Sequence, residues 1–166
     1  ATDRYLIKLF PGEYVLEENE IISISHAGID LIGSGQNASV ITGDYAWNCL
    51  AIDNGADSVI QNIKFECNVV CDNATPRFKN VRFINNGALA GIVASNGCHI
   101  SAVNCLIAKY FVGIALNHSS CEIRSCTIDE CWGPDKPEDL PFDWPEEWQT
   151  GFAGGAVISY KDPSYT

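Results

Sequence analysis

Long apolar runs and positive charge are what this sequence most clearly lacks. Six apolar or aromatic residues never follow one another, so no segment approaches the length required to cross a bilayer. Only 10 Lys and Arg residues stand against 21 Asp and Glu residues, which gives a formal net charge of −11. A surface of that sign repels phosphate backbones and anionic lipid headgroups. We therefore expect neither nucleic acid nor a membrane among the partners.

Helical periodicity and metal-binding cysteine spacing are also missing. Short segments of four to six residues, rich in Ile, Val and Phe, alternate between inward and outward positions as strands do and are separated by Asn, Gly, Ser and Asp. The eight cysteines include no Cys-x-x-Cys pair, which disfavours a metal centre, while their even number favours an oxidising compartment. Glycosylation sequons at Asn37, Asn73 and Asn117 are compatible with the extracellular or cell-surface location that we expect.

What the sequence does contain is a repeat. The stretch “GIVASNGCHISAVNCLIAKYFV”, from Gly91, is followed by “GIALNHSSCEIRSCTIDECW”, from Gly113, and two earlier segments align with this pair. Each unit has two apolar positions with a polar residue two places later. The apolar pairs are Leu50 and Ile52, Val69 and Cys71, Ile92 and Ala94, and Ile114 and Leu116, and the polar column is Asn54, Asn73, Asn96 and His118. We predict that this column is a structural ladder that passes hydrogen bonds from unit to unit.

The second half of each unit repeats as well, as “QNIKF”, “KNVRF”, “VNCLI” and “RSCTI”. Short strands with a period of about 20 to 24 residues, and no helix, are typical of a solenoid. The leucine spacing of leucine-rich repeats is absent. A parallel β-helix remains, in which each turn adds one rung and equivalent residues stack about 4.8 Å apart.

The beginning of the chain adds a family resemblance. A strand followed by “PGEY” at Pro11 to Tyr14, “IDLIGSG” at Ile29 to Gly35 and “SVITG” at Ser39 to Gly43 resembles the first coils of the pectin-lyase-like right-handed β-helix superfamily. The resemblance covers residues 5–131 and 155–160. It implies an all-β, single-stranded right-handed parallel β-helix of about six to seven coils. Residues 1–166 would form one domain, either alone or as part of a longer solenoid.

This superfamily includes polysaccharide lyases, hydrolases, esterases, epimerases, phage tailspikes and adhesins, so the resemblance implies a fold more than an activity. Its galacturonan hydrolases carry an Asp pair and a Gly-His-Gly element, and its methylesterases an Asp, Asp, Arg and Gln set. Neither set is found in this sequence, and “NGCHIS” at Asn96 to Ser101 lacks the second Gly. No catalytic residue is therefore carried over.

Cysteines occupy equivalent places in neighbouring units. The alignment pairs Cys105 with Cys126, and Cys98 with Cys121. Stacked equivalents come within the Cα distance that a disulfide permits, yet stacked free thiols also fill a β-helix core well. Both disulfides and thiols are compatible with this pattern.

Two basic residues form the first candidate site. Lys64 and Arg82 alternate with inward apolar residues, so both should point outward from neighbouring rungs of one sheet, and Arg77 and Lys79 lie just upstream. A basic strip on a strongly acidic protein is a candidate site for a carboxylated sugar chain. The alternative is that these are solvating charges on an exposed sheet.

An acidic, aromatic loop at residues 132–154 forms the second candidate site. It interrupts the repeat, because “GAVIS” at Gly155 resumes the “GIALN” pattern, and its four prolines exclude regular structure. Tryptophan faces beside carboxylates suit sugar rings, and clustered carboxylates could hold Ca²⁺. The candidate ligand-binding residues are Trp132, Asp143, Trp144, Glu147 and Trp148. A lid that buries its aromatic residues is the alternative.

Two functional hypotheses follow. The first is a secreted β-helix domain that binds or processes polysaccharide, and that, as an enzyme, would be a polysaccharide lyase or glycoside hydrolase. The second is a non-catalytic structural element of an extracellular fibre, adhesin or viral appendage. The second draws on the strand that opens near Tyr5 and on the final strand, which starts a new rung. Open ends of this kind predict homo-oligomers that stack end to end.

Overall fold

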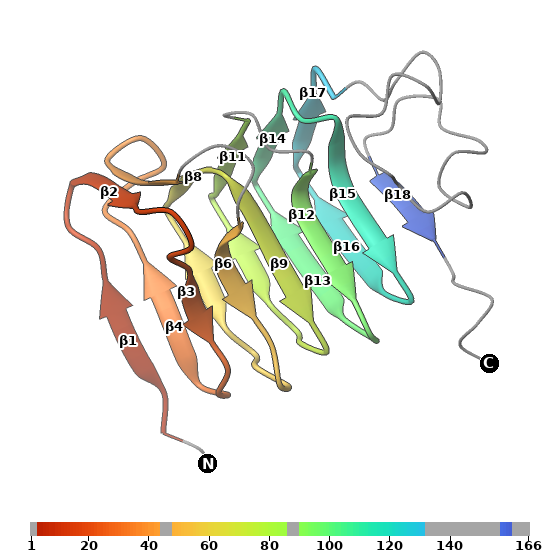
Figure 1. Ribbon diagram of the computed structural model, residues 1–166, viewed down its shortest axis with the longest axis horizontal. Coiled ribbons are helices and arrows are strands. Elements are labelled where there is room, and N and C mark those ends of the chain that lie inside the picture. Colours follow the sequence, from red (N-terminus) through yellow and green to blue (C-terminus); the bar gives the residue numbers. More distant parts are fainter. Residues whose placement is uncertain (1–2, 44–47, 86–89, 132–156, 161–166) are drawn as a thin grey trace.

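The described part of the chain winds as a parallel β-helix of six coils. A computed structural model describes residues 3–43, 48–85, 90–131 and 157–160, with the backbone alone for 158–160. These residues form strands β1 to β18 in three six-stranded sheets, and every strand pair is parallel. Each sheet takes every third strand, so the chain visits all three sheets once per coil (Figure 1). In the described part of the chain, no helix is long and apolar enough to cross a membrane. The predicted fold class is confirmed.

Sheet A carries the polar groove described below. Its strands, in spatial order, are β1 (Tyr5–Lys8), β4 (Ile29–Ile32), β7 (Val59–Gln61), β10 (Arg77–Lys79), β13 (His99–Val103) and β16 (Ser120–Arg124). Phe78 pairs with Ile60 on one side and Ala102 on the other, so core residues stack from coil to coil. Arg77 and Lys79 flank this buried residue and therefore point outward.

Sheet B contributes an aromatic cluster to the core. Its strands are β2 (Gly12–Leu16), β5 (Ser39–Gly43), β8 (Lys64–Glu66), β11 (Arg82–Ile84), β14 (Leu106–Ala108) and β17 (Thr127–Asp129). Phe65 and Phe83 are paired residues whose ring centroids lie 5.6 Å apart in a stacked arrangement. Phe78 of sheet A meets Phe83 edge-on at 5.3 Å. The cluster therefore ties sheet A to sheet B across the interior.

Sheet C confirms the alignment of the apolar pairs. Its strands are β3 (Ile22–Ile24), β6 (Asn48–Ile52), β9 (Asn68–Asp72), β12 (Ala90–Ser95), β15 (Val112–Asn117) and β18 (Val157–Tyr160). The predicted equivalents from Leu50 to Ile114 are all register partners. The repeat resumes one residue later than “GAVIS” suggested, because Val157 and not Ala156 pairs with Ile114.

Left-handed residues recur at the corner between sheets C and A and at the corner between sheets A and B, four times at each. Between sheets C and A they are Asn54, Asn73, Asn96 and His118, with φ between 46° and 55°. Between sheets A and B they are Asn62, Asn80, Asn104 and Ser125, with φ between 50° and 57°. Asn tolerates this conformation better than most residues, which explains why it recurs at fixed places in the sequence.

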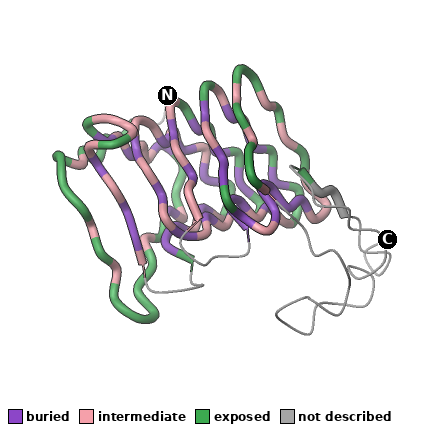
Figure 2. The backbone as a smooth tube through the Cα atoms, turned by 90° about the horizontal axis from the view of Figure 1, so that it is seen from above, coloured by how far each residue is buried: buried purple, intermediate pink, exposed green. Residues whose placement is uncertain are grey.

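Burial follows the inside of the coils, except in the first one. Figure 2 shows the buried positions running along the interior of the winding. Ile, Val, Leu and Phe side chains fill this interior, and their removal from water stabilises the stack. The first coil instead exposes large apolar side chains, which are Tyr5, Leu6, Ile7, Phe10, Val15 and Ile21.

Candidate functional site

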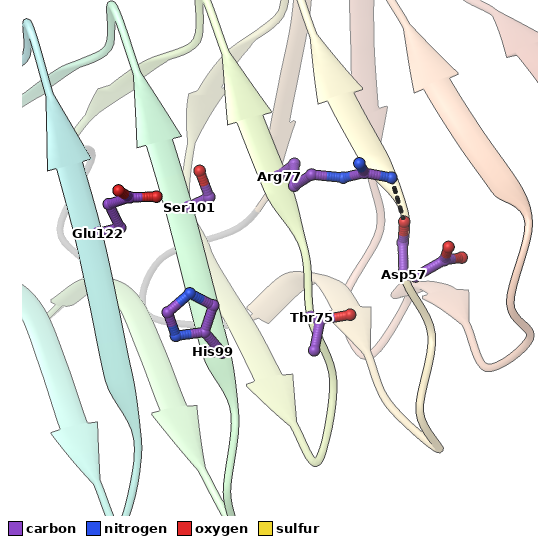
Figure 3. Close-up of a pocket in the computed structure, with 6 residues that line it drawn as sticks. All are labelled: Asp57, Thr75, Arg77, His99, Ser101 and Glu122. Atoms are coloured by element: carbon purple, nitrogen blue, oxygen red, sulfur yellow. Dashed lines mark hydrogen bonds between the residues drawn. The ribbon is translucent and has the colours of Figure 1, made fainter.

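The outer face of sheet A carries a groove of about 410 Å³. Six residues from four successive coils line it, as Figure 3 shows: Asp57, Thr75, Arg77, His99, Ser101 and Glu122. All six are polar or charged. A row of such residues across parallel strands is a surface that offers several hydrogen-bonding groups to one elongated ligand.

Strand register explains why these residues meet. Arg77 is the Cα partner of Ser101, and Ser101 is the partner of Glu122, so these three form one row across β10, β13 and β16. Thr75 and His99 lie two residues before members of that row and so point to the same face. The groove is thus lined by two neighbouring rows of outward-pointing residues, and each row crosses successive strands.

Asp57 forms the fixed end of the groove. Its carboxylate accepts one hydrogen bond from the Gly28 N–H at 2.8 Å and another from Arg4 Nη1 at 2.8 Å. Both bonds, first that from Gly28, hold the pKa of Asp57 below its usual value. Arg77 Nη2 donates to the backbone carbonyl of Asp57 at 3.4 Å. Asp57 is therefore a charged group that positions its neighbours.

The other end of the groove offers groups that can bind a ligand. His99 Nδ1 shares a hydrogen bond with Ser120 Oγ at 2.8 Å, and Glu122 forms an ion pair with Arg124. Within the described residues, the hydroxyls of Thr75 and Ser101 make no hydrogen bond. These hydroxyls can both donate and accept, so they suit a ligand that does the same.

The local charge of sheet A differs from that of the whole protein. Arg77 and Lys79 are exposed on β10 and, among the described residues, neither belongs to an ion pair. The nearby acidic groups are engaged, since Asp57 and Asp30 bind Arg4 and Glu122 binds Arg124. The middle of the groove therefore presents positive charge on a protein whose net charge is −11.

The predicted basic strip is divided between two sheets. Lys64 and Arg82 are register partners on sheet B, as expected, but Lys79 lies on sheet A. Lys64 forms an ion pair with Glu66, and Arg82 Nη1 donates to Asn37 Oδ1 at 2.8 Å. Both sheet B cations are half-buried. Lys64 and Arg82 remain candidate binding residues, although some of their hydrogen-bonding groups are already used by intramolecular partners.

The aromatic loop lies outside the described residues. This applies to Trp132, Asp143, Trp144, Glu147 and Trp148, and with them to the Ca²⁺ prediction that drew on the loop. In the ranges that the structure describes, no three His, Cys, Asp or Glu side chains are grouped as a metal site would require.

The ladder of amide side chains lies mainly at the corner that sequence reasoning did not choose. Asn80 Nδ2 donates to Asn62 Oδ1 at 3.3 Å, and Asn104 Nδ2 donates to Asn80 Oδ1 at 2.6 Å. In the predicted column, the Asn96 side chain donates to Asp72 Oδ1 at 2.6 Å instead. The repeated Asn of “QNIKF”, “KNVRF” and “VNCLI” was the sequence signal for the actual ladder.

Cysteine pairing differs from the alignment. A disulfide joins Cys49 to Cys67, which sequence reasoning missed, and the other six cysteines are free thiols. Cys121 is the register partner of Ile100, so it is not equivalent to Cys98. Cys98 instead neighbours Cys71, and its thiol donates to the Ala74 carbonyl oxygen at 3.0 Å. Cys105 and Cys126 do stack, because the residues that follow them are partners.

The winding of three parallel sheets defines the class of this protein as a parallel β-helix. Residues 2–132 match the family described as “Right handed beta helix region”, and the chain belongs to that family. This agrees with the fold implied by the superfamily resemblance. No curated protein matches the chain.

One solved structure similar to this chain is “Geobacillus virus E2 - ORF18”. The two share 12% sequence identity and a TM-score of 0.42 over 77% of this chain. The similar part spans 41% of the viral protein's length.

Proposed function

We propose that this β-helix domain binds polysaccharide along the groove on the outer face of sheet A. The observation that carries the proposal is the row of polar side chains that strand register builds across successive coils. Neighbouring strands are about 4.8 Å apart, so the row offers a hydrogen-bonding group at intervals comparable to one sugar ring. An extended glycan can then make many weak contacts at once.

The chemistry of the groove suits sugar hydroxyls. Thr75 and Ser101 supply hydroxyls, His99 supplies an imidazole, and Arg77 supplies a planar guanidinium with several donors. Positive charge at Arg77 and Lys79 favours a glycan that carries carboxylate or sulfate groups. The described residues do not define a catalytic set, so the proposal concerns binding.

A glycan array followed by calorimetry tests this proposal. The array should include neutral, uronic-acid and sulfated oligosaccharides, and the best binder is then titrated against variants. Arg77→Gln should weaken binding by about tenfold, the effect of losing roughly 1.4 kcal/mol of charged hydrogen bonding. Lys109→Gln removes an exposed cation that follows β14 on the far side of the coil and should change affinity by less than about twofold. Equal effects of both substitutions, or no binding to any glycan, would contradict the proposal.

The first coil supports a second candidate, end-to-end assembly of copies of this chain. Strands β1, β2 and β3 are edge strands, and this coil exposes Leu6, Ile7, Phe10 and Val15. At the opposite edges of the same three sheets lie β16, β17 and β18. A second copy could therefore continue all three parallel sheets and cover the apolar edge.

Light scattering after size-exclusion chromatography tests assembly. Mass should rise with concentration, and Leu6→Lys should abolish the rise while leaving glycan affinity unchanged. Monomers at every concentration would contradict assembly without affecting the glycan proposal.

A further inference from the structure

Cysteines lie at places where one coil meets the next. Cys49 and Cys67, whose Cα atoms are 5.9 Å apart, already form a disulfide of this kind. Cys105 and Cys126 occupy equivalent positions on the corner between sheets A and B, directly before the paired residues Leu106 and Thr127. The second pair consists of free thiols. Like the disulfide three coils earlier, this pair joins two neighbouring coils.

The backbone geometry around Cys105 and Cys126 is compatible with a disulfide. The Thr127 N–H donates to the Cys105 carbonyl at 2.9 Å, and the Cys105 N–H donates to Cys126 Sγ at 3.3 Å. Adjacent parallel strands lie about 4.8 Å apart, which falls within the 4.4–6.8 Å range of Cα separations in disulfides. The two sulfurs can therefore join by side-chain rotation, without movement of either coil.

The two thiols differ in accessibility. Cys105 is 3% exposed, and burial raises its pKa to about 12. Cys126 is only half-buried and can be reached from solvent. An external oxidant therefore meets Cys126 first, and Cys105 is the resolving thiol.

We infer that Cys105 and Cys126 are an oxidisable pair whose disulfide locks the coil of β16 and β17 onto the coil before it. With a small disulfide such as oxidised glutathione, the Cys126 thiolate forms a mixed disulfide and releases one glutathione. The Cys105 sulfur then attacks Cys126 Sγ and releases the second glutathione. The protein loses two protons and two electrons, which the oxidant takes up as two glutathione thiols.

The other four free thiols are not expected to form a disulfide in the native protein. Cys71 and Cys98 are also in contact, but both are almost fully buried, so an oxidant cannot reach either of them in the folded protein. Among the described coils, Cys121 faces Ile100 in the register and Cys131 stacks on Tyr110, so neither has a stacked thiol. A disulfide between two cysteines of the native protein should therefore form at Cys105 and Cys126 alone, whereas Cys121 and Cys131 can react only as far as a mixed disulfide with glutathione.

Peptide mapping of the full chain tests this. The native protein, with Cys49–Cys67 intact, is incubated with oxidised glutathione, its remaining thiols are alkylated in denaturant, and the digest is analysed without reduction. We expect a cross-linked peptide pair containing Cys105 and Cys126, with Cys71 and Cys98 alkylated and any bound glutathione confined to Cys121 and Cys131. Cys121→Ser is the matched control and should keep the cross-link, whereas Cys105→Ser should stop at glutathionylated Cys126.

Hydrogen exchange then tests the lock itself. Exchange of the Thr127 amide should slow by at least about tenfold after oxidation, because the cross-link holds the strand that carries its acceptor. Four results of the peptide mapping would overturn the inference. They are a Cys71–Cys98 link alone, a link from Cys126 to another cysteine, wild-type protein that retains glutathione on Cys126, and an unchanged thiol count. If the cross-link forms but hydrogen exchange is unchanged, the disulfide does not hold the coil of β16 and β17 on the coil before it.

Discussion

Replacing Phe83 by Ala should remove a large share of the stability of this protein. The Phe83 ring is fully buried, stacks on Phe65 at 5.6 Å and meets Phe78 edge-on at 5.3 Å. Truncating a buried Phe to Ala costs about 3–5 kcal/mol, and the two aromatic contacts place Phe83 toward the upper part of that range. Because domains are stable by only about 5–15 kcal/mol, we expect a loss of roughly 4 kcal/mol to be obvious.

Urea denaturation followed by far-ultraviolet circular dichroism measures this loss. Phe10→Ala is the matched control, since Phe10 is 75% exposed and its truncation should change the free energy of unfolding by less than about 0.5 kcal/mol. The m-value of both variants should equal that of the wild type, as required when only native packing has changed. A loss below about 2 kcal/mol for Phe83→Ala at constant m would refute the packing of these coils.

Three further predictions concern the links between coils. Replacing both Cys49 and Cys67 by Ser should lower the free energy of unfolding by about 3 kcal/mol, and equal urea midpoints would contradict this. Asn80→Ala should lower the free energy of unfolding by about 2 kcal/mol, because it removes both ladder hydrogen bonds and places Ala in the left-handed conformation. Asn80→Gly should lower it by less, because Gly adopts that conformation without strain. A larger loss for Gly than for Ala would be inconsistent with the ladder. Because the Gly28 amide and Arg4 lower the pKa of the Asp57 carboxyl, its contribution is present above the unfolded pKa near 3.8 and is lost as pH falls through the lower folded pKa. The urea midpoint should therefore fall in that acid range, and Arg4→Gln should flatten the fall.

The fold was predictable because the core of a β-helix is itself repetitive. The apolar pairs from Leu50 to Leu116 mark one sheet in four consecutive coils, and each pair proved to be in register with the next. Inward residues must be apolar in every coil, so periodicity alone reveals them. The same logic correctly placed Lys64 and Arg82 on neighbouring rungs.

Side-chain partners at the corners were not predictable, because corners vary in length. His99 lies three positions after Asn96, but its register partner Ser120 lies only two positions after His118. This shift moves Cys121 beside Ile100 and leaves Cys98 to meet Cys71. Periodicity likewise could not show which Asn column carries the amide hydrogen bonds, since both columns have the same backbone conformation.

The groove was missed for a related reason. Its members have no common residue type, and outward positions are under no requirement to be alike from one coil to the next. Thr75, Arg77 and Glu122 become neighbours only when strand register is known. A sequence search that looks for repeated residues will pass over such a surface.

The left-handed corners also give this protein a natural unit of growth. Asn62, Asn80 and Asn104 are separated by 18 and 24 residues, yet they stand above one another because each coil absorbs its extra residues between corners. Excising the chain from one corner to the next would remove a whole coil and bring two surviving corners into contact. Gene segments that begin and end at these asparagines could therefore be duplicated or lost without altering the cross-section, and the outer face of sheet A would lengthen or shorten by one strand each time.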